Sequence, residues 1–159
     1  MAIVDPNAHP RAVCQQKVST AEVGPDESHL QFRVPQPSWE RYVLVVEDDA
    51  TLRELYRSAL RAAGYAVVGV EDGIDALRLI EGGKPGALVL DLALPRLSGR
   101  AVSRELQAHE HTQDIPVIIV TGTDTSDLNP DQFACILHKP IDPDALVDAV
   151  QKSVRNLWA

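Results

Sequence analysis

Cysteine, aromatic residues and long apolar runs are all scarce in this chain. Its two cysteines, Cys14 and Cys135, are too few and too far apart among 159 residues to predict a disulfide framework or a zinc site. No stretch approaches the ~20 consecutive apolar residues that span a bilayer, and residues 1–11 lack the apolar segment of a secretory leader. We therefore expect a cytoplasmic protein with no membrane partner. Cys135 lies within an apolar run, so we interpret it as a core residue.

Basic residues are outnumbered by acidic ones. The chain has 15 lysines and arginines against 23 aspartates and glutamates, which gives a formal net charge of -8. The phosphates of nucleic acid favour a basic surface, so this balance predicts no direct nucleic-acid partner. What is present is ordinary globular composition, with 45% apolar and 24% charged residues, in a length that suits one domain.

The chain divides near residue 40. Residues 1–39 contain five prolines and no sustained helical or alternating period, which predicts a flexible N-terminal extension. In residues 40–159 short apolar runs alternate with amphipathic stretches, a pattern typical of a parallel sheet covered by helices. The predicted strands are Tyr42 to Val46, Ala66 to Val70, Ala87 to Leu90, Ile115 to Val120 and Ala134 to His138. We expect an α/β fold, a doubly wound five-stranded parallel sheet in a flavodoxin-like three-layer sandwich.

Polar residues follow four of the five predicted strands. Glu47 and Asp48 follow the first, Asp91 the third, Thr121 the fourth and Lys139 the fifth. Since the carboxyl ends of parallel strands meet at one edge of an open sheet, we expect these side chains to lie together. Adjacent carboxylates repel each other unless a cation neutralises them, and a hard cation such as Mg²⁺ takes oxygen ligands. The sequence thus predicts a site that handles phosphate and a hard cation.

Each of these residues also has an ordinary interpretation. An acidic pair near a helix start can cap the helix, and we expect Asp49 to be that N-cap, as we expect of Asp72, Ser98 and Asp142 for the later helices. A lone Asp, Thr or Lys at a strand end can belong to a turn or to a solvated surface. Their occurrence together at successive strand ends favours the functional interpretation.

From about Arg41 to Trp158 the chain resembles a receiver domain of the two-component response-regulator family. The segments that carry the resemblance are Val45-Val46-Glu47-Asp48-Asp49, Asp91 to Gly99, Val120-Thr121-Gly122 and Lys139-Pro140-Ile141. The resemblance implies that Asp91 is the phosphoacceptor, Thr121 the switch hydroxyl and Lys139 the amine that contacts the phosphate. It implies a Mg²⁺ site formed by the carboxylates of Glu47, Asp48 and Asp91 with the backbone carbonyl of Ala93.

The function that this resemblance implies is that of a single-domain response regulator. Asp91 receives a phosphoryl group from a sensor histidine kinase or a histidine phosphotransfer protein, and the chain assists its own phosphoryl transfer and dephosphorylation without being an enzyme in the usual sense. The downstream target is unknown, and a homodimer is left open. Two alternatives remain, a phosphorelay intermediate that passes the phosphate on and a phosphate-independent scaffold. An Asp-x-Asp phosphatase is disfavoured, since Leu92-Ala93 follows Asp91.

The chain departs from the family pattern in two places. Ile136 stands three residues before Lys139, where the family usually has Tyr or Phe, so a switch based on an aromatic rotamer is in doubt. The segment Gly122 to Phe133 is short, which predicts a shortened fourth helix: one turn starting near Pro130 behind an Asn129 cap. We expect residues 123–127, which are all polar, to form a mobile loop.

Overall fold

The computed structural model describes residues 13–14 and 42–158 of the chain, with side chains from residue 42 to residue 155. The expected flexible extension, residues 1–39, lies outside the described residues except for one short strand. The strands are β1 (Val13–Cys14), β2 (Tyr42–Val46), β3 (Ala66–Val70), β4 (Ala87–Leu90), β5 (Val117–Thr121) and β6 (Cys135–His138). The helices are α1 (Ala50–Ala62), α2 (Gly73–Gly82), α3 (Gly99–Ala108) and α4 (Pro143–Trp158), with a single 3₁₀ turn, η2 (Pro130–Gln132).

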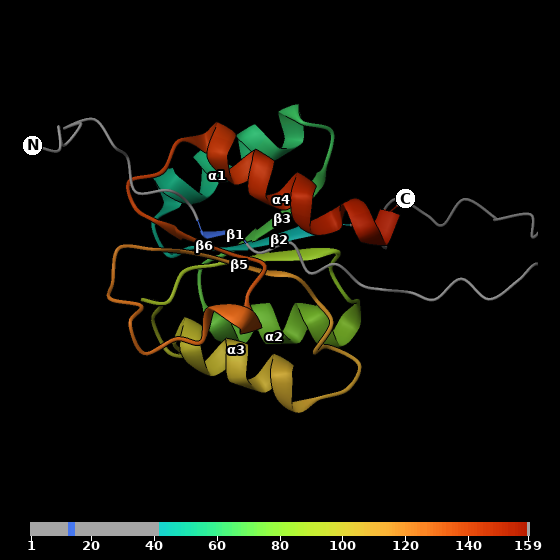
Figure 1. Ribbon diagram of the computed structural model, residues 1–159, viewed down its shortest axis with the longest axis vertical. Helices are drawn as coiled ribbons and strands as arrows, with labels where there is room; N and C mark the ends of the chain where they lie inside the picture. The colour runs from blue at the N-terminus through green and yellow to red at the C-terminus, as the bar shows by residue number, and fades with distance from the viewer. Residues whose placement is uncertain (1–12, 15–41, 159) are drawn as a thin grey trace, which may run out of the picture.

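Five of the strands form a parallel sheet in the order β6-β5-β4-β2-β3. Helices α1 and α4 cover one face of this sheet, and α2 and α3 cover the other (Figure 1). The doubly wound three-layer sandwich expected from the sequence is therefore confirmed, and three of the five predicted strands have the expected bounds. In the described part of the chain, no helix is long and apolar enough to cross a membrane.

The side chains of the central strands point alternately into two separate hydrophobic cores, one on each face of the sheet. Val43, Val45 and Val89 point toward α1 and α4, whereas Leu44 and Leu90 point toward α2 and α3. All four residues of β4 are buried, because helices pack on both faces and strands pair on both edges. This continuous burial leaves the end of β4 as the first place where the chain can present a polar side chain.

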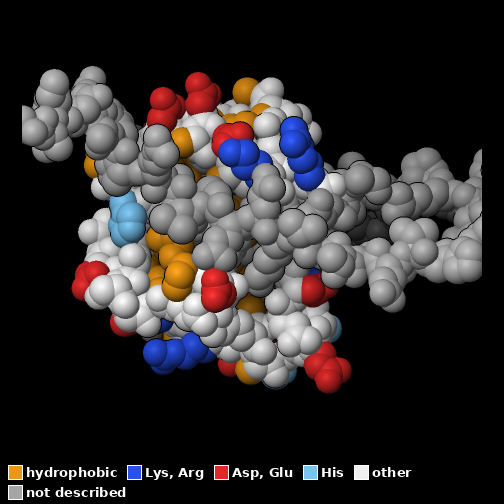
Figure 2. All heavy atoms as spheres, viewed as in Figure 1, with side chains coloured by type: hydrophobic (Ala, Val, Ile, Leu, Met, Phe, Trp, Pro, Cys, Tyr) orange, Lys and Arg blue, Asp and Glu red, His pale blue; other side chains and the backbone are white. Residues whose placement is uncertain are grey.

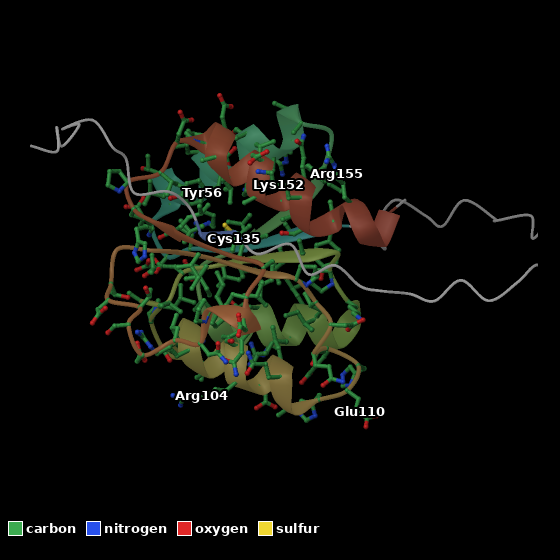
Figure 3. All side chains as sticks on the ribbon, viewed as in Figure 1. Tyr56, Arg104, Glu110, Cys135, Lys152 and Arg155 are labelled. Carbon is green, nitrogen blue, oxygen red and sulfur yellow. The ribbon has the colours of Figure 1, made fainter. Side chains whose placement is uncertain are left out.

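The sixth strand was not expected from the sequence. β1 pairs antiparallel with β6, with Val13 opposite Ile136 and Cys14 opposite Cys135. A two-residue strand has no period to detect, and its pairing depends on the free edge of β6, which is created only when the sheet is assembled. Cys135 is buried in the sheet layer between the helix pairs, as expected (Figure 3), but it is disulfide-bonded rather than a free thiol, which the sequence analysis did not expect.

The shortened fourth helix is confirmed. The only helical turn between β5 and β6 in the described chain is η2, and the Asn129 side chain caps it by accepting from the Asp131 N–H at 3.1 Å. Pro130 occupies the first helical position, where its missing N–H costs nothing. The segment between β5 and β6 consequently covers the α3 side of the sheet as a loop.

Charged side chains are distributed unevenly over the surface. In the view of Figure 2 the basic side chains lie in separate groups over α4 and beside α3, and acidic side chains are scattered around them. Figure 3 places Lys152 and Arg155 on α4 and Arg104 on the outer side of α3.

Candidate functional site

The site is located where β2 and β4 end side by side. After β2 the chain turns to α1 on one face of the sheet, and after β4 it leads to α3 on the other. The carboxyl edge at such a divergence is the position at which open α/β sheets bind ligands. Glu47 is 2% exposed and Asp91 is 4% exposed at this edge, although both are acids.

Three carboxylates converge there. Glu47, Asp48 and Asp91 each present an oxygen, and these oxygens all lie within 4.8 Å of one another. Glu47 and Asp91 are buried, whereas Asp48 is exposed. Like charges at this distance in a partly dry site oppose each other's ionisation, so a cation beside them favours their ionised forms.

Lys139 supplies one positive charge. Its Nζ donates to Glu47 Oε2 at 2.7 Å and to Asp91 Oδ2 at 2.8 Å. The lysine follows β6, and its backbone N–H donates to the Thr121 carbonyl at 2.9 Å, so the last residue of β5 and the first residue after β6 are tied together. The structure thus brings Glu47, Asp91 and Lys139 into direct contact, with Thr121 beside Lys139.

The pKa values reflect this arrangement. Burial raises the pKa of Glu47 above its ordinary value, and the hydrogen bond from Lys139 opposes that rise. Burial alone would lower the pKa of Lys139, but hydrogen bonds to Asp91 and Glu47 outweigh it, so the pKa lies well above the ordinary 10.5. The amine of Lys139 therefore stays charged at every pH at which proteins are ordinarily folded.

Backbone amides orient the remaining oxygens. The Asp49 N–H donates to Glu47 Oε1 at 3.1 Å, and the Ala93 N–H donates to Asp91 Oδ1 at 3.1 Å. Asp49 itself caps α1, as expected, by accepting from the Thr51 and Leu52 amides. Each oxygen of the two buried carboxylates consequently has a fixed partner, which holds both side chains in place before any ligand arrives.

The loop after Asp91 is built tightly against the strand end. A Cβ at Gly99 would lie 2.0 Å from the Asp91 carbonyl oxygen, so only glycine fits at that position. Ser98 caps α3 through the Ala101 N–H, as expected. This close approach explains why the residue eight positions after Asp91 is a glycine.

Arg96 is a feature that the sequence analysis missed. It has a φ of 60°, in the left-handed region that non-glycine residues rarely adopt. Its guanidinium pairs with Asp72, a buried N-cap of α2, and lies 3.5 Å from Asp75. The ion pair links the Asp91 loop to α2.

The pKa of Asp72 should report this link. Hydrogen bonds from the Asp75 N–H and then from Arg96 hold the pKa of Asp72 below its ordinary 3.8. The contribution of Asp72 to the stability of the folded protein is therefore complete at pH values above 3.8. It is lost as the pH falls through the lower pKa that Asp72 has in the folded protein. We expect Arg96→Asn, which tolerates the positive φ, to raise the pKa of Asp72 part of the way to 3.8 in a carboxyl NMR titration.

Arg78→Asn is the matched control for that titration. Arg78 lies 3.5 Å from Asp75 and is 72% exposed, and no ion pair joins it to Asp72 in the described residues. Its replacement should leave the Asp72 titration unchanged. An unshifted Asp72 in Arg96→Asn would show that the backbone amides alone set its pKa.

Thr121 is fully buried at the end of β5. Both hydrogen bonds of its side chain in the described chain go to Thr123: Oγ1 lies 3.0 Å from Thr123 Oγ1 and accepts from the Thr123 N–H at 3.2 Å. Ile136, at the position where the family usually has an aromatic residue, is half-buried against the core on the α3 side.

Two more arginines near the site were missed from the sequence. Arg53 donates to the Glu47 carbonyl at 2.8 Å, which holds the end of β2 against α1. Arg100, in the first turn of α3, holds the loop after Thr121 through Asp127. Arg53 contacts a carbonyl six residues before it and Arg100 a carboxylate 27 residues after it, and a charged residue on a helix face gives no sequence signal for either partner.

Comparison with known proteins gives the class of this chain. The sequence model of one protein family, the response regulator receiver domain, matches residues 43–151 of this chain. The chain therefore belongs to the response regulator receiver domain family, whose members act in two-component signalling.

Particular relatives support this assignment. Response regulator MprA from Mycobacterium sp. (strain KMS) is 41% identical over 83 residues, which are 52% of this chain and 35% of that protein. The response regulator TrrA from Thermotoga maritima, solved in complex with Mg²⁺-BeF, is 29% identical with a TM-score of 0.64, over 71% of this chain and 98% of that chain. A Francisella response regulator receiver domain, 24% identical, shares the fold with a TM-score of 0.67 over 74% of this chain and 98% of that chain. The match covers about a third of the length of the curated relative.

Proposed function

We propose that this chain is a receiver that accepts a phosphoryl group on Asp91 from a histidine kinase or a histidine phosphotransfer protein. The observation that carries the proposal is the contact of Lys139 with both Asp91 and Glu47. A buried carboxylate at a sheet edge, oriented by a backbone amide and touched by an ammonium group, is a usable nucleophile toward phosphorus. We propose further that residues 40–159 form the receiver domain, that residues 1–39 are a flexible extension, and that the protein acts in the cytoplasm.

Mg²⁺ fits the donor set of the site. The three clustered carboxylates offer oxygen ligands only, which hard cations prefer, and Asp48 has no ion-pair partner among the described residues. Glu47, Asp48 and Asp91 would hold the ion together with the Ala93 carbonyl. The bound ion would supply charge neutralisation at the transferred phosphoryl group.

The chain's own groups account for the remaining requirements. An Asp91 carboxylate oxygen attacks phosphorus, the phosphorus–nitrogen bond of the donor phosphohistidine breaks, and an acyl phosphate forms with the histidine as leaving group. Lys139, already 2.8 Å from Asp91 Oδ2, stays charged and contacts the phosphoryl oxygens. In the product the Thr121 hydroxyl donates to the same group. Positioning of the reactants and stabilisation of charge therefore account for most of the catalysis of this transfer.

The output of the domain is proposed to be a contact with a downstream protein. Ile136 and the single-turn η2 favour a second candidate, a phosphate-independent scaffold, because the parts that usually transmit the signal are altered. Intact-mass measurement with a small phosphodonor and Mg²⁺ separates the two candidates, because a scaffold gains no phosphoryl group. A chain that keeps its mass under these conditions would exclude the proposed function.

Activation should reshape the segment between β5 and β6. Leu128 and Phe133 pack on the α3-side core and also line a small pocket together with Arg100, so a change in this segment is felt at α3. We expect beryllofluoride with Mg²⁺ to change amide hydrogen exchange most between Thr121 and Phe133. The buried strand β4 serves as the internal reference, and a maximum elsewhere in the domain would contradict this route.

A further inference from the structure

The hydroxyl of Thr121 has one hydrogen to donate, and the surroundings decide where it goes. Thr121 is 0% exposed, so water cannot accept the hydrogen. Thr123 is exposed, so its own hydroxyl can donate to water. A buried donor without an acceptor is costly, and Thr123 Oγ1 at 3.0 Å is the acceptor that the structure provides in the described chain. Thr121 is therefore the donor of this pair.

The position of Thr123 is fixed from the other side. We name residues 122–129 the strap. Arg100 of α3 forms a bidentate ion pair with Asp127 of the strap: Nε donates to Oδ2 at 3.0 Å and Nη2 donates to Oδ1 at 2.9 Å. Nη2 also donates to the Asp124 carbonyl at 2.7 Å. Paired guanidinium–carboxylate bonds of this kind are geometrically specific. The strap thus holds Thr123 beside Thr121.

We infer that Thr123 is a positioning residue that restrains the Thr121 hydroxyl in the resting state. The inference rests on the proposed function, in which Thr121 donates to the phosphoryl group on Asp91. The single hydrogen cannot serve Thr123 Oγ1 and a phosphoryl oxygen together, so every activation event must break the Thr121–Thr123 bond. Removal of the Thr123 hydroxyl frees the hydrogen in advance and favours the activated state.

The test compares beryllofluoride affinity in Mg²⁺ by calorimetric titration of the full chain. Thr123→Val removes the acceptor and keeps the shape, and it should tighten binding about two- to tenfold, the equivalent of one ordinary hydrogen bond. Thr123→Ser restores the hydroxyl and should return the affinity to the wild-type value. Thr125→Val is the matched control, because the Thr125 hydroxyl faces His138 Nε2 at 3.4 Å instead of Thr121. That control should bind as the wild type does.

A second background isolates the contact itself. In Thr121→Ala the Thr123 substitution should have no effect, since the restrained hydroxyl is gone. Equal affinity of Thr123→Val and the wild type, or tightening that persists in Thr121→Ala, would overturn the inference while leaving the proposed function intact. A wild-type chain that binds no beryllofluoride would instead overturn the proposed function, and the inference with it.

Discussion

We expect Asp91→Asn to abolish phosphorylation: the wild-type chain, incubated with Mg²⁺ and a small phosphodonor such as acetyl phosphate, should gain the mass of one phosphoryl group, and the variant should gain none. The amide nitrogen and oxygen of asparagine are poor nucleophiles, whereas an ionised carboxylate forms an acyl phosphate. The variant should fold, because Lys139 then faces the single carboxylate of Glu47 in place of two, and the Asn oxygen can still accept from the Ala93 N–H. Loss of labelling therefore reports chemistry rather than unfolding.

Asp114→Asn is the matched control for labelling. Asp114 is an exposed acid that pairs with Lys84 on the surface, and its replacement should leave the mass gain complete. A chelator should abolish labelling of the wild-type chain, because the three clustered carboxylates otherwise oppose an incoming anion. Labelling of Asp91→Asn at the wild-type level would assign the phosphoacceptor to another residue.

Replacement of Lys139 has the second large effect, and it concerns stability as well as signalling. Lys139→Met keeps the apolar stem but leaves two buried carboxylates without their ammonium partner. Breaking a buried ion pair from one side costs about 3 kcal/mol at the lower end of the usual range, so we expect the free energy of unfolding to fall by about that much. The family resemblance implies only that this amine contacts the phosphate, and its two contacts with buried carboxylates add a role in stability.

The pH dependence of the free energy of unfolding provides a second test of this prediction. Without Lys139, the raised pKa of Glu47 should rise further, and a carboxyl with a raised pKa adds stability only while it is protonated. The stability deficit of Lys139→Met should therefore shrink as the pH falls toward and below the ordinary 4.5 and grow as the pH rises through the folded value. Denaturant unfolding across this range measures it.

Lys84→Met controls for the loss of a lysine as such. Lys84 pairs with Asp114 at the surface and is 45% exposed, so its replacement should change the free energy of unfolding by less than about 1 kcal/mol. The Lys139 variant should also lose the exchange response of residues 121–133 to beryllofluoride. An unaltered stability and an unaltered response in Lys139→Met would show that its ion pairs contribute to neither.

The elements of this domain could be predicted from the sequence because each carries its own local signal. The apolar run of β4 cannot leave a face in water, and the caps Asp49, Asp72 and Ser98 mark helix starts by a hydrogen bond within three residues. The turn at Pro130 was predictable for the same reason, since asparagine and proline act on their neighbours alone.

The convergence of the site residues was also implicit in the sequence. Parallel strands that end at one edge must bring together whatever follows them, so the positions of Glu47, Asp91, Thr121 and Lys139 in the chain predicted their proximity. Their roles in phosphoryl transfer come from the family resemblance and remain to be tested by the variants above.

Only the tertiary structure decided how these groups are partnered. Lys139 and Glu47 are 92 residues apart, and no local pattern specifies that one ammonium bridges two carboxylates. The pairing of Arg96 with Asp72, the fork of Arg100 on Asp127 and the addition of β1 to the edge of β6 likewise join segments distant in the chain. Local sequence sets secondary structure through hydrogen bonds between near neighbours, whereas these contacts depend on distances that are fixed only when the whole sheet and its helices have packed.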